Sequence, residues 1–269
     1  MTTGMGRLMP HKEDNIFAGS NVSRLALHAM SEIALAQKTL QTKTDSNNCL
    51  YEIISWACDS SQTIQPNEMR KILLKQLPAD LIVDSLIPEA AYWLGNQWVK
   101  DEMHFVGVTK ASAKLQQLVW AFTDHLDHRL LHTAPNICSV LVVVPQFCHH
   151  TLGSVVLHHQ LTRDGVAAHL AMGLAPEELG QKVATYDFDG IFLSVSTREH
   201  LELTRKLLVF LKNIVASRTP IILGGRLARN MSQADDCGGA DMVCDNYQEA
   251  LNFVQRSRKP NRVWPERRA

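Results

Sequence analysis

The sequence lacks the cysteine spacings and the charge imbalance that mark several common protein classes. None of its six cysteines forms a CxxC pair or a metal-finger spacing, so a zinc finger and a dithiol redox site are not indicated. Lysine and arginine balance aspartate and glutamate. The resulting formal net charge of zero argues against bulk electrostatic binding of nucleic acid.

Long apolar runs are also missing. The chain opens with the polar segment MTTGMGRLMPHKED, and later apolar stretches break at polar or charged residues well short of a membrane span. We therefore expect a reduced, soluble and cytoplasmic protein with no signal segment. Hydrophobic residues make up 45% of the 269 residues, which is enough for two modest domains with cores of their own.

The first half of the chain shows helical periodicity and no strand signal. Apolar residues recur at helical spacing in five segments, with a polar, turn-like stretch at 41–48 after the first. The predicted helices are 18–37, 50–57, a segment that opens at Pro66, 79–97 and 104–132. This pattern predicts a helical bundle cap over residues 16–133, preceded by a disordered segment, 1–15.

From about Pro135 short apolar runs alternate with helical stretches. The runs typical of buried strands are 139–144, 166–170, 190–195, 220–223 and 241–244. The helical stretches are 151–163, 176–186, 198–216, 227–236 and 247–257. This alternation predicts an α + α/β chain whose residues 136–257 form a Rossmann-like domain, a five-stranded parallel sheet flanked by helices. The basic segment 258–269 is predicted to be a solvated tail.

Ligands of such sheets bind beyond the carboxyl ends of the strands. In the first loop at this edge, His150 follows a buried strand and precedes a helix, so its imidazole can project from the sheet. Neutral imidazole is a good ligand for cobalt or iron, and Gly153 lets a bulky planar ligand approach the backbone. Small residues end the third and fourth strands, Ser194 and Ser196 in one loop and the pair Gly224–Gly225 in the other. Together the three loops predict one ligand site.

This three-part arrangement resembles the cobalamin-binding domain family, whose pattern is Asp-x-His-x-x-Gly, then Ser-x-Leu, then Gly-Gly. The resemblance implies that His150 replaces benzimidazole as the lower axial ligand. It also implies that the nucleotide tail inserts between Ser194 and the floor formed by the glycine pair. Two positions depart from the pattern, because Cys148 replaces the aspartate and Ser196 the leucine. The missing carboxylate argues against methyltransferase or mutase chemistry, so we do not expect an enzyme.

The helical cap adds a resemblance to a more specific group of proteins. The segment Leu94-Gly95-x-x-Trp98 through Val108-Thr109 and Leu115-Gln116, taken with the His150 loop, is similar to the AerR/PpaA antirepressors of purple bacteria and to the sensor domain of AppA. The likeness implies a cobalamin-dependent, light-responsive regulator that binds a DNA-binding repressor of photosystem genes and does not contact DNA itself. Trp98 would then pack over an adenosyl upper ligand, most simply that of adenosylcobalamin. The alternative for Trp98 is a place in the helical core.

Three alternatives stay open. The same scaffold is compatible with a heme-binding redox or gas sensor, because Cys148 and His150 are both reasonable iron ligands. It is also compatible with a corrinoid carrier of a methyltransferase system, or with a scaffold that has lost its cofactor. Candidates for an exchanged upper ligand are His104, His125, His128 and His132.

The sequence thus predicts particular residues for this site. His150 is the predicted metal ligand. The predicted cofactor contacts are Trp98, Val108, Thr109, Cys148, His149, Thr151, Leu152, Gly153, Ser194, Ser196, Gly224, Gly225 and Arg226.

Overall fold

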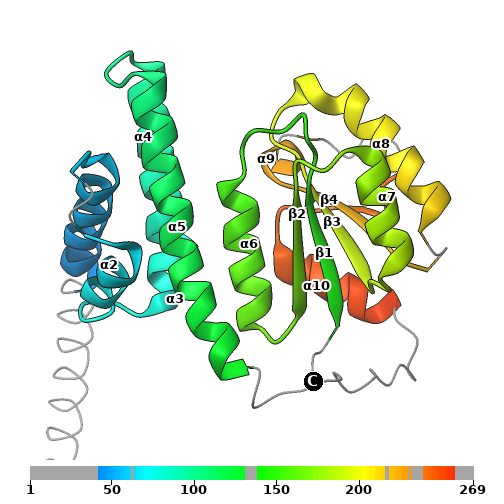
Figure 1. The fold of residues 1–269 in the computed structure, drawn as a ribbon, viewed down its shortest axis with the longest axis horizontal. Coiled ribbons are helices and arrows are strands. Elements are labelled where there is room, and N and C mark those ends of the chain that lie inside the picture. The colour runs from blue at the N-terminus through cyan, green and yellow to red at the C-terminus, as the bar shows by residue number, and fades with distance from the viewer. Residues whose placement is uncertain are drawn as a thin grey trace, which may run out of the picture. The chain divides into compact units, whose positions relative to one another are not determined.

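The computed structural model describes residues 42–61, 64–130, 138–215, 218–229, 231 and 239–257, without the side chains of 127–130 (Figure 1). The predicted helix 18–37, the N-terminal segment 1–15 and the tail 258–269 lie outside the described residues. Among the described residues, no helix combines the length and the apolar character that a membrane span needs.

The N-terminal half is helical, as predicted. Its elements are a helix over residues 42–58, α2 (Pro66–Leu73), α3 (Ala79–Leu81), the π-helix η1 (Ile82–Leu86), α4 (Ile87–Val99) and α5 (Phe105–Leu130). The turn expected at 41–48 is wrong over 42–48, which continue the helix that buries Ile53 and Trp56. Ser46 Oγ donates to the Thr42 carbonyl at 2.8 Å, a helical side-chain bond that a polar sequence permits.

The π-turn before α4 has a local cause. Pro88 has no N–H, so it cannot make the hydrogen bond that an α-helix would require to the carbonyl of Asp84. The chain widens into η1 immediately before it. The buried residues Ile82, Val83 and Leu86 nevertheless keep this turn inside the helical core.

The C-terminal half is a five-stranded parallel sheet, which confirms the predicted fold class. The strands are β1 (Ser139–Val144), β2 (Ala167–Met172), β3 (Gly190–Ser194), β4 (Ile221–Gly224) and β5 (Met242–Val243), in the order β2-β1-β3-β4-β5. The helices are α6 (Leu152–Arg163), α7 (Pro176–Thr185), α8 (Leu201–Ile214), α9 (Arg226–Arg229) and α10 (Tyr247–Ser257). The predicted helix 198–216 opens as a 3-10 turn, η2 (Arg198–His200). Of the predicted helix 227–236, residues 232–236 lie outside the described part.

Strand β1 is buried on both faces, because helices cover each side of the sheet (Figure 1), whereas the edge strands β2 and β5 are only partly buried. On β1, Leu141 and Val143 join the core cluster that contains residues of α7 and α8, whereas Val140 and Val142 join the cluster that contains residues of α6 and α10. Continuous apolar strands of this kind are what a parallel sheet with two covered faces demands.

Helix α5 packs against α6, and polar groups are buried between them. Thr123 Oγ1 donates to the Val119 carbonyl at 3.0 Å and lies 3.0 Å from His159 Nδ1. Nδ1 must then carry the proton that it donates to Thr123, and His159 Nε2 is buried without a hydrogen-bond partner. The imidazole is therefore held neutral. Burial first, and then the positive charge of Arg163, lower the pKa of His159 to about 4.

Arg163, at the end of α6, connects the two halves of the chain. It donates to Asp84 of η1 at 2.9 Å and to Asp80 of α3 at 3.1 Å, and its Nη2 lies 3.3 Å from the Tyr247 hydroxyl. Burial alone would lower the pKa of Arg163, but the hydrogen bond and the charge of Asp84 raise it above its ordinary value. The guanidinium is thus a permanent cation that the two carboxylates hold in place.

The ends of β3 and β4 are tied together through Gly225. Val195 N–H donates to the Gly224 carbonyl at 3.2 Å, and Leu227 N–H donates to the Val195 carbonyl at 3.0 Å. Gly225 has a φ of +86°, and a Cβ there would lie 2.6 Å from the Val195 carbonyl oxygen. Only glycine satisfies both conditions, so the second residue of the glycine pair is required by the backbone itself.

The first prediction concerns the pH dependence of folding. Because the pKa of His159 is about 4 in the folded protein and near 6.5 in an unfolded chain, the unfolded state binds more protons between these values. The free energy of unfolding should fall as the pH drops from 6.5 to 4, with a contribution from this residue of up to about 3 kcal/mol. Urea titrations across this range should show a shallower dependence for His159→Leu than for the wild type. His125→Leu, at an exposed position of α5, should keep the wild-type slope, and equal slopes in all three proteins would contradict the assignment.

The second prediction compares two glycines at the sheet edge. Gly225→Ala should lower the free energy of unfolding by about 2 kcal/mol, because it combines positive φ with a backbone clash. Gly153→Ala should change it by no more than about 0.5 kcal/mol, since a Cβ at Gly153 meets no atom within 4 Å. Chemical denaturation of both variants measures the difference; a stable Gly225→Ala protein would show that this loop is built differently.

Candidate functional site

The site lies where the direction of the chain connections reverses. β1 pairs with β2 on one side and β3 on the other. The chain leaves β1 for α6 on one face and leaves β3 for α8 on the opposite face. In open parallel sheets, ligands bind at this reversal, beyond the carboxyl ends of the strands. The loops 145–151 and 195–200 therefore border the crevice at which the fold itself places a ligand.

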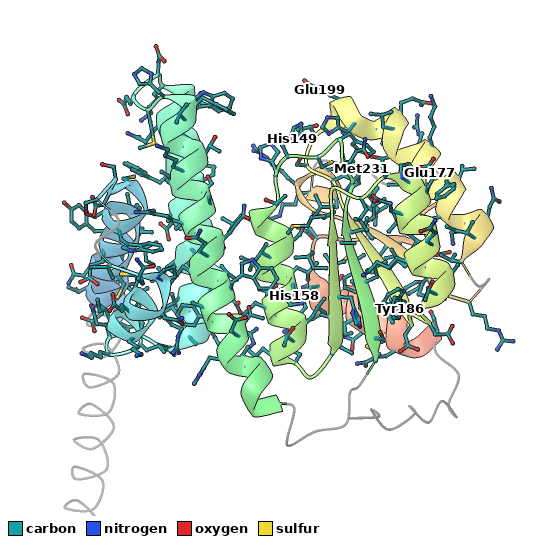
Figure 2. All side chains as sticks on the ribbon, viewed as in Figure 1. His149, His158, Glu177, Tyr186, Glu199 and Met231 are labelled. Carbon is teal, nitrogen blue, oxygen red and sulfur yellow. The ribbon has the colours of Figure 1, made fainter. Side chains whose placement is uncertain are left out.

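The first loop presents two histidines to the outside. Cys148 N–H donates to the Pro145 carbonyl at 2.8 Å, which closes a tight turn after β1. His149 and His150 follow, and both are exposed. Figure 2 shows His149 at the same end of the sheet as Glu199 and Met231, with Tyr186 at the opposite end. An exposed imidazole at this edge is available to a ligand.

The loop is attached to the cap where α6 begins. Thr151, the residue before α6, accepts a hydrogen bond at 2.7 Å from Gln116 Nε2 of α5. Leu152 is half-buried at the first position of the helix, and Gly153 is exposed. The position of the two histidines therefore depends on both the sheet and the cap.

Cys148 turns inward rather than toward the surface. Its side chain is 6% exposed and belongs to the core cluster under the sheet edge. Its Sγ lies 3.6 Å from His200 Nδ1, and it also accepts the backbone N–H of Ser196. Burial raises the pKa of the Cys148 thiol, and the Ser196 hydrogen bond offsets this only in part. The thiol is thus a neutral connection between the first and third strand-end loops.

The third and fourth loops meet the same edge. Ser194 pairs with Gly224 in the β3–β4 register, and both are half-buried. A Cβ at Gly224 would lie 3.3 Å from the Cys244 carbonyl oxygen, so the backbone at Cys244 lies close to Gly224. Arg226 is exposed at the start of α9. The sheet brings the predicted residues of all three loops to one edge.

The predicted cap residues are placed differently. Trp98, at the end of α4, is 52% exposed, so the alternative of a core position is wrong. Its ring centroid lies 6.4 Å from that of Phe105, and Thr109 Oγ1 donates to the Phe105 carbonyl at 2.9 Å. Val108 is half-buried. The described contacts of Trp98 and Thr109 are all within the cap, and none of them reaches the strand-end loops.

The candidates for an upper ligand do not form a metal centre. His104 and His125 are exposed, whereas the side chain of His128 and all of His132 lie outside the described residues. In the part of the chain that the structure describes, no group of three or more His, Cys, Asp or Glu side chains is arranged to hold a metal ion.

The residues present fit a corrin-type cofactor. His150 offers an exposed imidazole, which is a nitrogen donor suited to cobalt. Beside it, the space in front of Gly153 admits a Cβ without any contact, so a broad planar ring can approach the backbone. Ser196 Oγ is buried at the edge without a hydrogen-bond partner. A buried hydroxyl of this kind is unfavourable unless something else satisfies it, as a polar cofactor tail would.

Three residues with a place in this arrangement were not predicted. Gln116 holds Thr151, while Thr197 and His200 lie behind the first loop, with Thr197 Oγ1 3.2 Å from His200 Nδ1. His200 lies 52 residues from Cys148 in the sequence. No local pattern connects residues at such separations, so only the fold reveals them.

Comparison with known proteins identifies this domain. Residues 138–252 match the B12-binding domain family. A curated relative, the uncharacterized 20.5 kDa protein in the bchF-crtJ intergenic region of Rhodobacter capsulatus, is 29% identical over 170 residues. That alignment covers 63% of this chain and 88% of the relative.

A solved structure shows the same fold. The monomethylamine corrinoid protein of Methanosarcina barkeri superposes with a TM-score of 0.60 at 13% identity, covering 76% of this chain and 96% of that one. A cobalamin-binding protein from Desulfitobacterium hafniense DCB-2 covers 78% of this chain and 98% of its own, with 16% identity and a TM-score of 0.37. The matched segment begins one residue before β1 and ends within α10. Residues 138–252, which contain the whole parallel sheet, therefore match the B12-binding domain family.

Proposed function

We propose that the chain is a cobalamin-dependent, light-responsive transcriptional regulator, an antirepressor that binds a repressor of photosystem genes. The observation that carries the cofactor assignment is the meeting of His150, Gly153 and the Ser196 hydroxyl at the reversal point of a B12-binding domain. The chain in this proposal senses and binds, and does not catalyse a reaction.

Each loop has a separate task in holding the cofactor. His150 would supply an imidazole nitrogen to the cobalt, and Gly153 would leave room for the ring beside it. Ser194 and the orphaned hydroxyl of Ser196 take the polar atoms of the nucleotide tail. When bound, adenosylcobalamin supplies a cobalt–carbon bond that visible light breaks. The exposed aromatic ring of Trp98 then serves as the surface through which the cap responds.

Two observations support a regulator rather than an enzyme. The relative encoded in the bchF-crtJ intergenic region, a photosynthesis gene region, is covered over 88% of its length, so the likeness extends beyond the cofactor domain. In addition, Cys148 stands where the family pattern has an aspartate, and its thiol contacts His200 in the core instead of orienting the axial histidine. Carboxylate–histidine pairs raise the basicity of a metal ligand, and this chain lacks that device at position 148.

The third prediction tests the axial ligand. The purified chain should bind adenosylcobalamin with a spectrum in which protein imidazole has replaced benzimidazole, and blue-green light should change that spectrum. His150→Ala should abolish this spectrum and weaken binding at least tenfold, the equivalent of about 1.4 kcal/mol. His149→Ala is the matched control for the metal ligand, because it removes the neighbouring exposed histidine, and it should keep the spectrum of imidazole coordination. Binding of heme in place of cobalamin, or an unchanged spectrum in His150→Ala, would refute the assignment.

The fourth prediction tests the partner. A DNA-binding repressor of photosystem genes from the same organism should be retained by the immobilised, adenosylcobalamin-loaded chain to different extents in darkness and after illumination. A ligand shifts an equilibrium only by its differential affinity for the two states, so His150→Ala should show one level of retention under both conditions. Equal retention by the wild type in light and dark would remove the light switch, and methyl transfer to an added enzyme would favour a carrier.

A further inference from the structure

Cys148 and His200 connect the loop that carries His150 to the loop that carries Ser194 and Ser196. The Sγ of Cys148 lies 3.6 Å from His200 Nδ1 and accepts the Ser196 backbone N–H. The ring of Phe147, the residue before Cys148, meets the His200 ring edge to face at a centroid distance of 5.3 Å. His200 thus contacts two consecutive residues of the first loop, a few positions before the axial histidine.

His200 is itself firmly placed. It is the last residue of η2, its N–H donates to the Thr197 carbonyl at 3.3 Å, and its carbonyl accepts the Thr204 hydroxyl of α8 at 2.8 Å. Thr197 Oγ1 also lies 3.2 Å from His200 Nδ1. The backbone of the third loop and the start of α8 therefore fix the imidazole, which leaves the first loop as the part that adjusts to it.

On the basis of the proposed function, we infer that Cys148 and His200 form a positioning pair that couples the seating of a nucleotide tail beside Ser196 to coordination by His150. Neither residue touches the metal. A tail that fills the space at the Ser196 hydroxyl fixes the segment from Ser194 to Thr197. This segment holds the Ser196 N–H that Cys148 accepts and the Thr197 hydroxyl that lies beside His200 Nδ1. The coupling runs through one thiol and one imidazole with two defined contacts.

Cys148 does not hydrogen-bond to His150 directly and acts on it only through its contacts with the third loop. A carboxylate at position 148 would act on the axial imidazole locally, whatever the state of the third loop. The buried thiol instead makes the position of the first loop depend on the third loop. Coordination by His150 then becomes conditional on recognition of the tail, which selects complete cobalamins over corrinoids that lack the nucleotide.

The experiment compares adenosylcobalamin with adenosylcobinamide, which has the same ring and upper ligand but no nucleotide tail. Dissociation constants are measured in the dark by absorbance titration of the full chain, for the wild type and His150→Ala. In the wild-type background, the factor by which His150→Ala raises the dissociation constant should be at least about fivefold larger for the cobalamin than for the cobinamide. We call this difference the excess. Coupled sites commonly interact to this extent. In the Cys148→Ala and His200→Ala backgrounds, the two losses should become equal.

Conservative variants and a matched cavity separate positioning from simple loss of packing. Cys148→Ser and His200→Gln keep hydrogen-bonding groups and should restore part of the excess. Cys138→Ala also removes a fully buried thiol, but from the opposite core cluster before β1, and it should leave the excess unchanged. The position of the absorbance bands reports imidazole coordination in each complex independently of affinity.

The outcomes are distinguishable. If the wild type binds neither corrinoid, the proposed function fails, and this inference fails with it. If His150-dependent binding occurs but the excess is absent from the wild type, or persists in Cys148→Ala and His200→Ala, the pair does not couple the loops, and the proposed function stands without it. If the two losses are unequal in the wild type but equal in the Cys148→Ala and His200→Ala backgrounds, the coupling is established.

Discussion

The pairing of β1 with β3 is the constraint on which the site depends. Because these parallel strands are neighbours but send their connections to opposite faces, their carboxyl ends cannot be covered by one helix. In this chain the loops that follow them also contact each other, through Cys148, Ser196 and His200. A backbone hydrogen bond from Val195 to Gly224 extends the same edge to β4. The strand order therefore determines where the ligand loops lie, and the sequences of the loops then determine their contacts.

Contacts between α5 and α6 connect the cap to this edge of the sheet. Gln116 holds Thr151 at the start of α6, Thr123 contacts His159 in the middle, and Arg163 is bound by Asp84 at the end. α6 begins two residues after His150, so a shift of the helix relative to α5 moves the loop as well. The ion pair of Arg163 with Asp84 joins the end of α6 to η1, whereas the groups that connect α5 to α6 at Thr151 and His159 are uncharged.

The sequence was sufficient for the fold class because short, mostly apolar strand segments alternate with helical ones after residue 138. β1 and α10 have the predicted bounds, whereas β5 is two residues long, Met242–Val243, where four were predicted. The three loops could be placed at one edge by the rule for parallel sheets alone. His200 could not, since its contact with Cys148 depends on how far η2 turns back toward β1, which no periodicity encodes. The turn expected at 42–48 failed because polar composition does not distinguish an exposed helix from a loop.

The replacement of a carboxylate by Cys148 follows from where that side chain lies. The position belongs to an apolar cluster with Val144 and Leu193, where an ionised group would need a cation to compensate for lost hydration. A thiol contacts the His200 ring without any charge, and this contact leaves both imidazoles free of a fixed anion. His150, which is exposed, therefore has no carboxylate at position 148 to orient its ring. On the proposed function, an axial histidine without such a partner suits a protein whose output depends on the ligand state of its cofactor more than one that must hold a reactive metal through repeated chemical steps.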